Sequence, residues 1–514
     1  MRIATIISAL VAASTGFSQN GAFDPSFGPG GYTLFDPTSF FPDRSVELIV
    51  DGAGRPVAGG NNYAGNNTYC WVCRALPNGG MDNSFGGDGC VDVNLCTSND
   101  ALADMRVLSD GRIMGIGSED FGLPFTYDQS VVFRLNVDGT LDTTWAHTGK
   151  AFHGISGQDL GSLAMDVAAD GSVLALGYLV VGAYWYERIW RFLPDGAIDT
   201  TFQNNGFLSV QLAYPEWVEY SDIMFQSTGR FLIAGRETST YGGTFGAWNA
   251  IRRYTAEGNV DSTFAVDGLL RDTISGRAMS SPKVLLLPDD RILLYGTWTN
   301  GTDVGIGMAR YLSDGDRDPS FGQNGTVLMA PFGSSSLVVG NATLLSDGRV
   351  ALPVPSSTSD STEVIAILPD GAQDLTFGFG GTAHGNYAFV GHAAAAQGDS
   401  AIVVVSASSN QSLAYLRYRV ASIALGVAVT GHGEPLTVFP VPSRDGEVMI
   451  QWQGTPLENA EVEVLDLTGR SVPVRVRCSS DRIQLAGVAP LRAGQYMVRV
   501  NVLGQKAVAR VMID

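Results

Sequence analysis

A motif that recurs seven times constrains the fold of this chain more than any other feature of its sequence. The motif reads Gly-x-x-Asp-x-x-aromatic-x-x-x-Gly and returns about every 58 residues. Its aspartates are Asp24, Asp82, Asp142, Asp199, Asp261, Asp318 and Asp374. Self-similarity at a fixed period is typical of solenoids, propellers and other repeat arrays. We therefore expect one supersecondary unit, used seven times, to build most of the chain.

Each repeat contains four short segments of β type. A short run such as 207–210 follows the motif, and a second run ends in a tight turn, as at 105–111. A third run begins directly after that turn, as at 112–114, and a fourth leads into the next motif, as at 131–135. Asp-Gly between apolar runs is typical of a β-hairpin turn, whereas helical periodicity is nearly absent.

Four strands per unit and seven units predict an all-β chain dominated by a seven-bladed β-propeller. This architecture leaves only short, protected sheet edges. A solenoid or a pair of sandwiches is the alternative. We place the propeller at residues 19–424, a linker at 425–436 and a small separate β-domain at 437–514.

The motif residues have structural roles that involve no chemistry. The first glycine permits the positive φ of a tight turn. The aspartate can accept N–H bonds from residues two or three positions later, and the aromatic ring is expected to fill space between blades. In five units an arginine stands eight residues before the aspartate, where it could pair with the carboxylate or a neighbouring carbonyl; these are Arg74, Arg134, Arg191, Arg253 and Arg310. The sixth unit has Ala366 there instead.

Calcium binding by the motif is not expected. One carboxylate per repeat falls short of the roughly six to eight oxygen ligands that Ca²⁺ takes.

The repeat resembles a known family. Asp-x-(Ser/Thr)-Phe-Gly followed by a strand and an Asp-Gly-Arg hairpin is similar to the delta-60 repeat of bacterial β-propeller-like proteins, over about residues 20–420. Trp145 in place of Phe and the missing arginine at Ala366 are the departures from this pattern. The resemblance implies a propeller-like fold and no particular activity.

The first 18 residues read as a secretory signal peptide. Arg2 supplies a positive charge, residues 3–13 form an apolar stretch, and Gly16 and Ser18 fit a signal-peptidase site. A buried N-terminal strand or helix is the alternative. No later run is apolar for about 18 residues, so no transmembrane segment is expected.

Residues 437–514 carry the landmarks of a small β-domain. These are Pro440, Pro442, Asp466, Gly469, Arg470, Gly494 and Tyr496. The segment resembles the type A C-terminal sorting domain of the type IX secretion system of Bacteroidota, an Ig-like sandwich, although Val441 replaces a usual Asn. The resemblance implies handling by the type IX machinery, passage across the outer membrane, removal of the domain, and release or surface attachment. An Ig-like module for adhesion or spacing is the alternative.

Cysteine placement agrees with export. Cys70, Cys73, Cys90 and Cys96 fall in the first two units, and disulfides are favoured over a zinc site because exported chains meet an oxidising compartment. Cys70 and Cys73 lie three apart on an apparent strand and point to opposite faces. Each is therefore expected to pair with Cys90 or Cys96, in either arrangement, and to fasten the first two blades.

The remaining sequence features leave the function open between two classes. The formal net charge of −19 disfavours nucleic acid as a partner. The five histidines fall in no recurring pattern, and no nucleophile elbow, metal-binding helix or phosphate loop occurs, so we predict no catalytic residue, metal or cofactor. We expect a non-enzymatic binding module on the cell surface or in the medium, its protein or polysaccharide ligand unknown. A secreted polysaccharide lyase or hydrolase, with acidic residues from several blades meeting at the channel, is the alternative.

Overall fold

The computed structural model of the chain consists of β-strands joined by turns. It describes residues 20–35, 47–64, 67–95, 100–119, 129–153, 159–181, 184–203, 205–211, 216–239, 246–299, 304–329, 339–355, 362–379, 381–384, 389–408, 413–420, 436–439, 447–452, 460–466, 472, 474–479, 483–487, 494–502 and 505–513. No helix occurs in these ranges, so none there could span a membrane. The chain consists of two compact units, residues 1–421 and residues 422–514.

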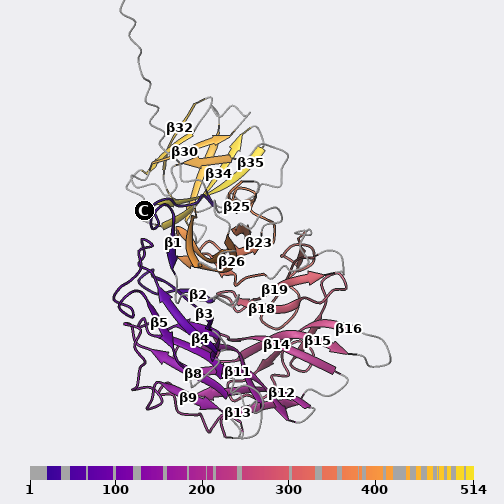
Figure 1. The fold of residues 1–514 in the computed structure, drawn as a ribbon. Helices are drawn as coiled ribbons and strands as arrows, with labels where there is room; N and C mark the ends of the chain where they lie inside the picture. The colour runs from indigo at the N-terminus through magenta and orange to yellow at the C-terminus, as the bar shows by residue number, and fades with distance from the viewer. Residues whose placement is uncertain are drawn as a thin grey trace, which may run out of the picture. The chain divides into compact units, whose positions relative to one another are not determined.

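The first unit is a seven-bladed β-propeller, as the repeat predicts. Each blade is a four-stranded antiparallel sheet, and Figure 1 shows the sheets arranged around a common axis. The strands nearest the axis are β2 (Glu47–Val50), β6 (Asp100–Val107), β10 (Asp159–Val167), β14 (Glu216–Phe225), β18 (Ser280–Leu286), β22 (Thr343–Leu344) and β26 (Phe389–Gln397). The second strands are β3 (Pro56–Ala64), β7 (Ile113–Glu119), β11 (Val173–Val181), β15 (Phe231–Ser239), β19 (Ile292–Thr299), β23 (Val350–Pro355) and β27 (Ala401–Ser408).

The outer half of each blade is formed by a third and a fourth strand. The third strands are β4 (Asn67–Arg74), β8 (Gln129–Leu135), β12 (Tyr184–Phe192), β16 (Gly246–Tyr254), β20 (Val304–Tyr311), β24 (Thr362–Ile367) and β28 (Leu413–Arg419). The fourth strands are β5 (Cys90–Val93), β9 (Lys150–His153), β13 (Phe207–Gln211), β17 (Leu269–Asp272), β21 (Thr326–Leu328), β25 (Thr382–His384) and, for the seventh blade, β1 (Tyr32–Phe35).

The ring is closed by the N-terminal strand. β1 pairs with β28, so the seventh blade takes its outer strand from the other end of the propeller sequence. In Figure 1 the indigo strand β1 lies beside the orange strands of that blade. Each sequence repeat is therefore offset from each blade by one strand, because the run that follows a motif belongs to the preceding blade.

Among the described residues of the propeller, the hydrophobic core is divided into seven clusters, one between each pair of neighbouring blades. Every cluster contains one aromatic residue of the motif, and each of these side chains is at most 2 % exposed: Phe27, Phe85, Trp145, Phe202, Phe264, Phe321 and Phe377. Burying such a ring removes on the order of 150–250 Å² of surface from water. The motif thus places one large apolar side chain at every blade interface.

A disulfide is confirmed, but it lies within one blade. Cys73 and Cys90 are register partners on β4 and β5, with their Cα atoms 4.1 Å apart. Because of the one-strand offset, the two cysteines belong to different repeats but to the same blade. The bond therefore does not link two blades, contrary to the prediction from the sequence. Cys70 is buried and free, and Cys96 lies outside the described residues.

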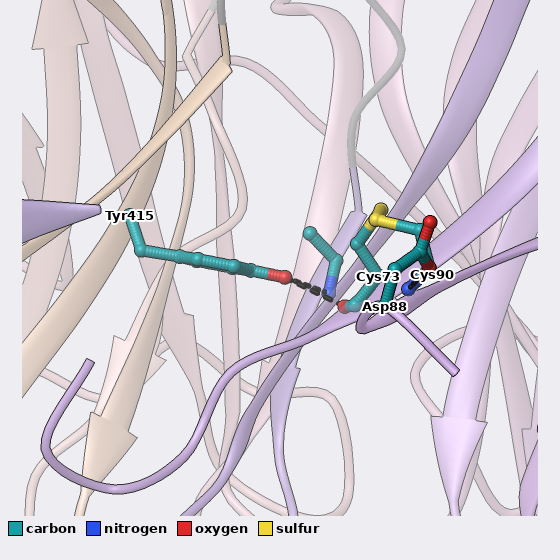
Figure 2. The surroundings of a disulfide bond; sticks show 5 residues. Cys73, Asp88, Cys90 and Tyr415 are labelled. Carbon is teal, nitrogen blue, oxygen red and sulfur yellow. Dashed lines mark hydrogen bonds between the residues drawn. A yellow bond between two sulfur atoms is a disulfide. The ribbon is translucent and has the colours of Figure 1, made fainter. Parts of the chain in front are cut away.

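The disulfide lies beside the ring closure. Figure 2 shows the Tyr415 hydroxyl from the seventh blade meeting the first blade next to Cys73. It donates a hydrogen bond to the Cys73 carbonyl at 2.6 Å and accepts one from the Ala58 N–H at 3.0 Å. Asp88 accepts a hydrogen bond from the Cys90 N–H at 3.0 Å. The closing blade is thereby fixed to the backbone of the first.

The second unit contains two antiparallel sheets. One holds β29 (Leu436–Phe439), β30 (Glu447–Trp452), β33 (Ile483–Gly487) and β32 (Val474–Cys478), and the other β31 (Glu461–Asp466), β34 (Gly494–Val502) and β35 (Gln505–Ile513). Two of the predicted landmarks, Asp466 and Tyr496, are register partners between β31 and β34, and Gly494 begins β34. Pro440, Pro442, Gly469, Arg470 and the predicted signal peptide lie outside the described residues.

Ring closure can be tested with two neighbouring residues of β1. Phe35 is 5 % exposed and stacks on Tyr415 with ring centroids 4.4 Å apart, whereas Leu34 is 51 % exposed. Phe35→Ala should lower the free energy of unfolding by about 3 kcal/mol, because it empties a core site at the junction. Leu34→Ala, the matched control, should change it by less than about 0.5 kcal/mol. Thermal denaturation measures both, and equal effects would show that β1 does not hold the ring closed.

Candidate functional site

The seven motif aspartates share one local geometry. In each, one carboxylate oxygen accepts both the N–H and the hydroxyl of the Ser or Thr two residues later; for Asp318 these bonds to Ser320 are 3.0 and 2.6 Å. The equivalent pairs elsewhere are Asp24–Ser26, Asp82–Ser84, Asp142–Thr144, Asp199–Thr201, Asp261–Thr263 and Asp374–Thr376. The preceding glycine, as at Gly315 with φ +97°, packs so closely that a Cβ there would lie 2.9 Å from the Phe264 ring of the neighbouring blade.

The other carboxylate oxygen binds arginine. Arg310 Nε lies 2.8 Å from Asp318 Oδ2, and Arg291, from the hairpin turn of the same blade, lies 3.1 Å from that oxygen. In each of the five units with the expected arginine, that residue reaches its own aspartate. Arg417 pairs with Asp24 in the same way across the ring closure, with its Nη2 atom 2.7 Å from Asp24 Oδ2.

The same arginines connect one blade to the next. Arg74 donates to the Val137 carbonyl of the second blade at 2.5 Å, and its guanidinium lies 4.6 Å from the centre of the Phe85 ring. Arg134, Arg191, Arg253, Arg310 and Arg417 likewise reach a turn carbonyl of the following blade and lie over their own motif aromatic. We call this set of three side chains the Arg–Asp–aromatic unit.

The sixth blade builds this unit differently. Ala366 occupies the arginine position, and Arg349 of the hairpin turn, fully buried, binds Asp374 at 2.9 Å instead. Asn20 accepts from Arg349 at 3.1 Å and donates to Asp374 at 3.2 Å. The residue directly before the first motif thus completes the contact between the last two blades.

These contacts account for the low pKa values of two motif aspartates, Asp318 and Asp142. Burial acts to raise the pKa of Asp318, but the bonds from Ser320 and the nearby guanidinium groups outweigh burial and hold it at about 2. Asp142 behaves in the same way, with a pKa of about 2. Carboxylates held this firmly by their own structure are poorly suited to bind a ligand or exchange a proton.

A second polar group lines the central channel, and it is the better candidate for a site. The seven inner strands share an equivalent position, three residues before the last residue of each strand. The residues at this position line a cavity of about 200 Å³. We call the shared position the channel position; around the ring it holds Glu47, Asp104, Ala164, Asp222, Lys283, Asn341 and Ala394. In four blades a β-bulge directly precedes it, and such bulges re-aim the side chains that follow them.

Two of the channel carboxylates bridge neighbouring inner strands. Asp104 accepts the N–H of Met165 at 3.0 Å, and Asp222 accepts that of Val284 at 2.8 Å. Asp166, two residues beyond the channel position of its strand, accepts the N–H of Phe225 at 2.8 Å. These bonds satisfy backbone donors at strand edges that face the axis.

Two cations accompany the carboxylates. Arg106 contacts Asp104 and lies 3.3 Å from Asp166. Lys283 donates to the Asn341 side-chain oxygen, and the Asn341 amide donates to Glu47. Asn341 therefore separates an ammonium group from a carboxylate group.

At the channel the pKa values of three acids are shifted upward, opposite to the net shift of Asp318 and Asp142. Burial raises the pKa of Glu47 and of Asp222 to about 6, with the charge of Lys283 opposing the shift in both. Burial also raises the pKa of Asp166, against the charge of Arg106. Perturbed acids gathered in a cavity are typical of functional sites, although structural networks produce them too.

No metal centre is found among the described residues of the site. Within the described ranges, no three His, Cys, Asp or Glu side chains come together in a way that could hold a metal ion. His384 pairs with Glu363 at 3.3 Å on an outer strand, away from the channel. What the channel offers is hydrogen bonding and charge of both signs.

Sequence reasoning did not single out the channel residues. The signal was present, since aligning the seven repeats on their hairpin turns brings Glu47, Asp104, Asp222, Lys283 and Asn341 into one column between apolar ones. Residue types in that column differ, so a search for a repeated motif passes over it.

The pH dependence of stability can test the motif acids. The pKa of Asp318 is depressed, so its ionised form stabilises the fold above the unfolded value of about 3.9, and this contribution is lost as pH falls through about 2. Asp318→Asn should cost about 1–2 kcal/mol at pH 7 after allowance for solvent screening, and much less near pH 2. The exposed Asp314, in the same blade, provides a control, Asp314→Asn. Denaturation at both pH values measures the difference, and a cost independent of pH would contradict this role.

Asp222 should behave in the opposite sense. Its folded pKa of about 6 lies above the unfolded value, so its ionisation destabilises the fold as pH rises from about 4 to 6. Asp222→Asn retains an acceptor for Val284 and should therefore raise the free energy of unfolding by about 2 kcal/mol at pH 8, with little change at pH 3.5. Thermal midpoints at the two pH values measure this, beside Asp399→Asn in an exposed turn. A variant less stable than wild type at pH 8 would refute the assignment.

Comparison with known families identifies both parts of the chain. Residues 437–514 match the family described as "Secretion system C-terminal sorting domain". Residues 108–144, 168–202 and 287–321 match that described as "Domain of unknown function (DUF5122) beta-propeller". No curated protein matches the chain significantly.

Several solved structures resemble the chain distantly. A protein of unknown function from Dyadobacter fermentans DSM 18053 has 11 % identity and a TM-score of 0.39, with 76 % of this chain and 98 % of that one covered. The polysaccharide lyase Uly1 has 9 % identity and a TM-score of 0.38, with coverages of 72 % and 89 %. The PQQ-bound aldose sugar dehydrogenase from Streptomyces coelicolor has 12 % identity and a TM-score of 0.34, with coverages of 63 % and 96 %. TM-scores this low carry no argument about function.

The family matches and the strand topology agree with each other. Three of the seven repeats match the propeller family, and the sorting domain follows the last blade. The chain is therefore a seven-bladed β-propeller protein that carries a type IX C-terminal sorting domain.

Proposed function

We propose that this protein is an exported β-propeller that binds an extracellular protein or polysaccharide without chemically altering it. Its sorting domain marks it for type IX secretion, to the cell surface or the medium. A signal peptide at residues 1–18 would first take the chain to the periplasm, and residues 437–514 would then be recognised by the secretion machinery and removed.

The observation that carries the binding role is that the repeated polar residues are already engaged in structural contacts between blades. The Arg–Asp–aromatic units fix the blades to one another, so the acids that recur in every repeat are occupied by structure. A propeller held in this way presents broad, rigid faces, which suit the recognition of a large partner. In the channel, Asp104 and Asp222 are likewise engaged with backbone N–H groups.

A secreted polysaccharide-degrading enzyme is the second candidate. It is favoured by Glu47 and Asp222, two acids in one cavity whose pKa values burial raises to about 6. Acids tuned toward neutral pH serve as general acids or bases. On this hypothesis the purified protein degrades a polysaccharide, and Glu47→Gln abolishes that activity while leaving the fold intact. Saturable binding of an intact polymer, unchanged by Glu47→Gln, supports the binding role instead.

Export can be tested by fractionating producing cells and measuring intact mass. The mature protein should begin at Gln19, lack residues 437–514 and occur on the cell surface or in the medium. A chain truncated after residue 436 should stay in the periplasm, because the signal for outer-membrane passage is gone. Protease resistance of its propeller provides the control for folding. A surface or secreted form that keeps its C-terminus through Asp514 would contradict removal of the sorting domain.

A further inference from the structure

We propose that the central cavity of the propeller binds a small zwitterion of net positive charge, of which a basic α-amino acid is the simplest example. This inference concerns the channel and does not depend on the polymer-binding role above. It rests on the size of the cavity, on the balance and placement of its charges, and on an ammonium group that is held away from the neighbouring carboxylates.

The size of the cavity restricts the ligand to a small molecule. Its volume of about 200 Å³ is enough for several water molecules but lies below the roughly 300–1,000 Å³ of pockets for drug-sized ligands. A polymer chain does not fit, whereas a molecule of amino-acid size does. The lining includes Ser221, Asn341 and three inner-strand acids, Glu47, Asp104 and Asp222, so the cavity is polar.

The balance of charge favours a cationic ligand. Glu47, Asp104 and Asp222 line the cavity against Arg106 and Lys283, and Asp166 lies beside Arg106, which leaves an excess of negative charge once all are ionised. Taking uncompensated charge out of water is costly. A ligand with net positive charge would offset this excess and should therefore bind favourably.

The placement of the carboxylates favours an organic cation over a metal ion. They come from four different blades, and no three of the described acidic side chains converge in the way a metal site requires. A metal ion concentrates its charge at one point and needs its ligands around that point. An ammonium group on a carbon chain can instead hydrogen-bond to carboxylates that are spread around a ring.

Lys283 supplies a positive group that can bind the carboxylate of a zwitterion. Its direct polar contact among the described residues is the hydrogen bond to Asn341, which leaves two of the three N–H donors of an ammonium group for an acceptor in the cavity. The Asn341 amide in turn donates to Glu47 and keeps the ammonium and carboxylate from pairing with each other. A positive and a negative group fixed at short spacing match the two ends of a zwitterion.

The order of blades gives the ligand an orientation. Lys283 comes from the fifth blade, which in a ring of seven lies opposite the first and second blades, and these supply Glu47 and Asp104. The ligand carboxylate would accept from Lys283, and its ammonium groups would donate to Glu47 and Asp104. The Ala164 and Ala394 channel positions leave room between the charged groups.

Calorimetric titration of the mature protein with three probes tests the proposal. L-lysine carries both features, 1,5-diaminopentane lacks the carboxylate, and succinate lacks the ammonium groups. L-lysine should bind saturably at one site, the diamine at least about tenfold more weakly, and succinate not at all. Absence of saturable binding by L-lysine would overturn the proposal and indicate a cavity that holds only water.

Channel variants assign each end of the ligand. Lys283→Met should weaken L-lysine binding by at least about tenfold, to the level of the diamine, and leave diamine binding unchanged or tighter. Glu47→Gln should weaken both ligands. Lys150→Met, which removes a half-buried lysine on β9, is the matched control. Wild-type binding of L-lysine by the Lys283→Met variant would refute the assigned contact.

Chemical labelling locates the site by a second, independent readout. Lys150, Lys283 and Lys506 are the lysines of the chain. Reductive methylation with formaldehyde and a borohydride reductant should modify Lys283 in the free protein, and excess L-arginine, whose α-amino group is methylated in the same reaction but stays cationic, should protect Lys283 but not Lys150. A Lys283 that resists the reagent in the free protein, or one that L-arginine does not protect, would count against an accessible cavity site.

Discussion

The pairing of a buried arginine with the motif aspartate is the interaction on which the propeller depends. A guanidinium placed between blades loses its water, and this loss is costly unless every charged neighbour and hydrogen-bond partner is in position. Arg310 meets that condition with Asp318, with Ser320 and with a carbonyl of the next blade, while it also covers the Phe321 ring. The contact therefore specifies the relative position of two blades as well as their attachment. Because the unit recurs at six of the seven interfaces, the same chemistry holds most of the ring.

The part of the fold encoded locally could be predicted from sequence. Turn glycines, the aspartate that accepts from the residue two positions later and the buried aromatic ring all act within a few residues of one another, so each repeat reveals them. The position of the disulfide could not be predicted as readily, because the one-strand offset between repeat and blade is decided by ring closure. The substitution of Arg349 for the arginine missing at Ala366 likewise depends on a contact between distant strands.

The channel shows a different limit of sequence reasoning. Glu47 and Asn341 are 294 residues apart, and only the closed ring brings their side chains into contact. Their types differ from those at the same position in other blades, so no repeated pattern marks them. The alternative of acids from several blades meeting at the axis anticipated the location, but the two cations that meet them there had no signature in the sequence.

The two polar systems have different roles: the Arg–Asp–aromatic units hold the blades together, and the channel residues line the cavity. The outer residues of the repeats are alike because each arginine meets the same partners, namely its own motif aspartate and aromatic ring and a turn carbonyl of the next blade. The channel position has no such partner in the next repeat. Its side chains meet across the axis, where seven different residues can combine into one asymmetric surface. Because the outer contacts hold the blades together, the residues at the channel position can differ from blade to blade. Chemical specificity is therefore expected to lie at the centre of this molecule. Lys283 and Glu47, unlike each other yet at equivalent positions, are the result of that freedom.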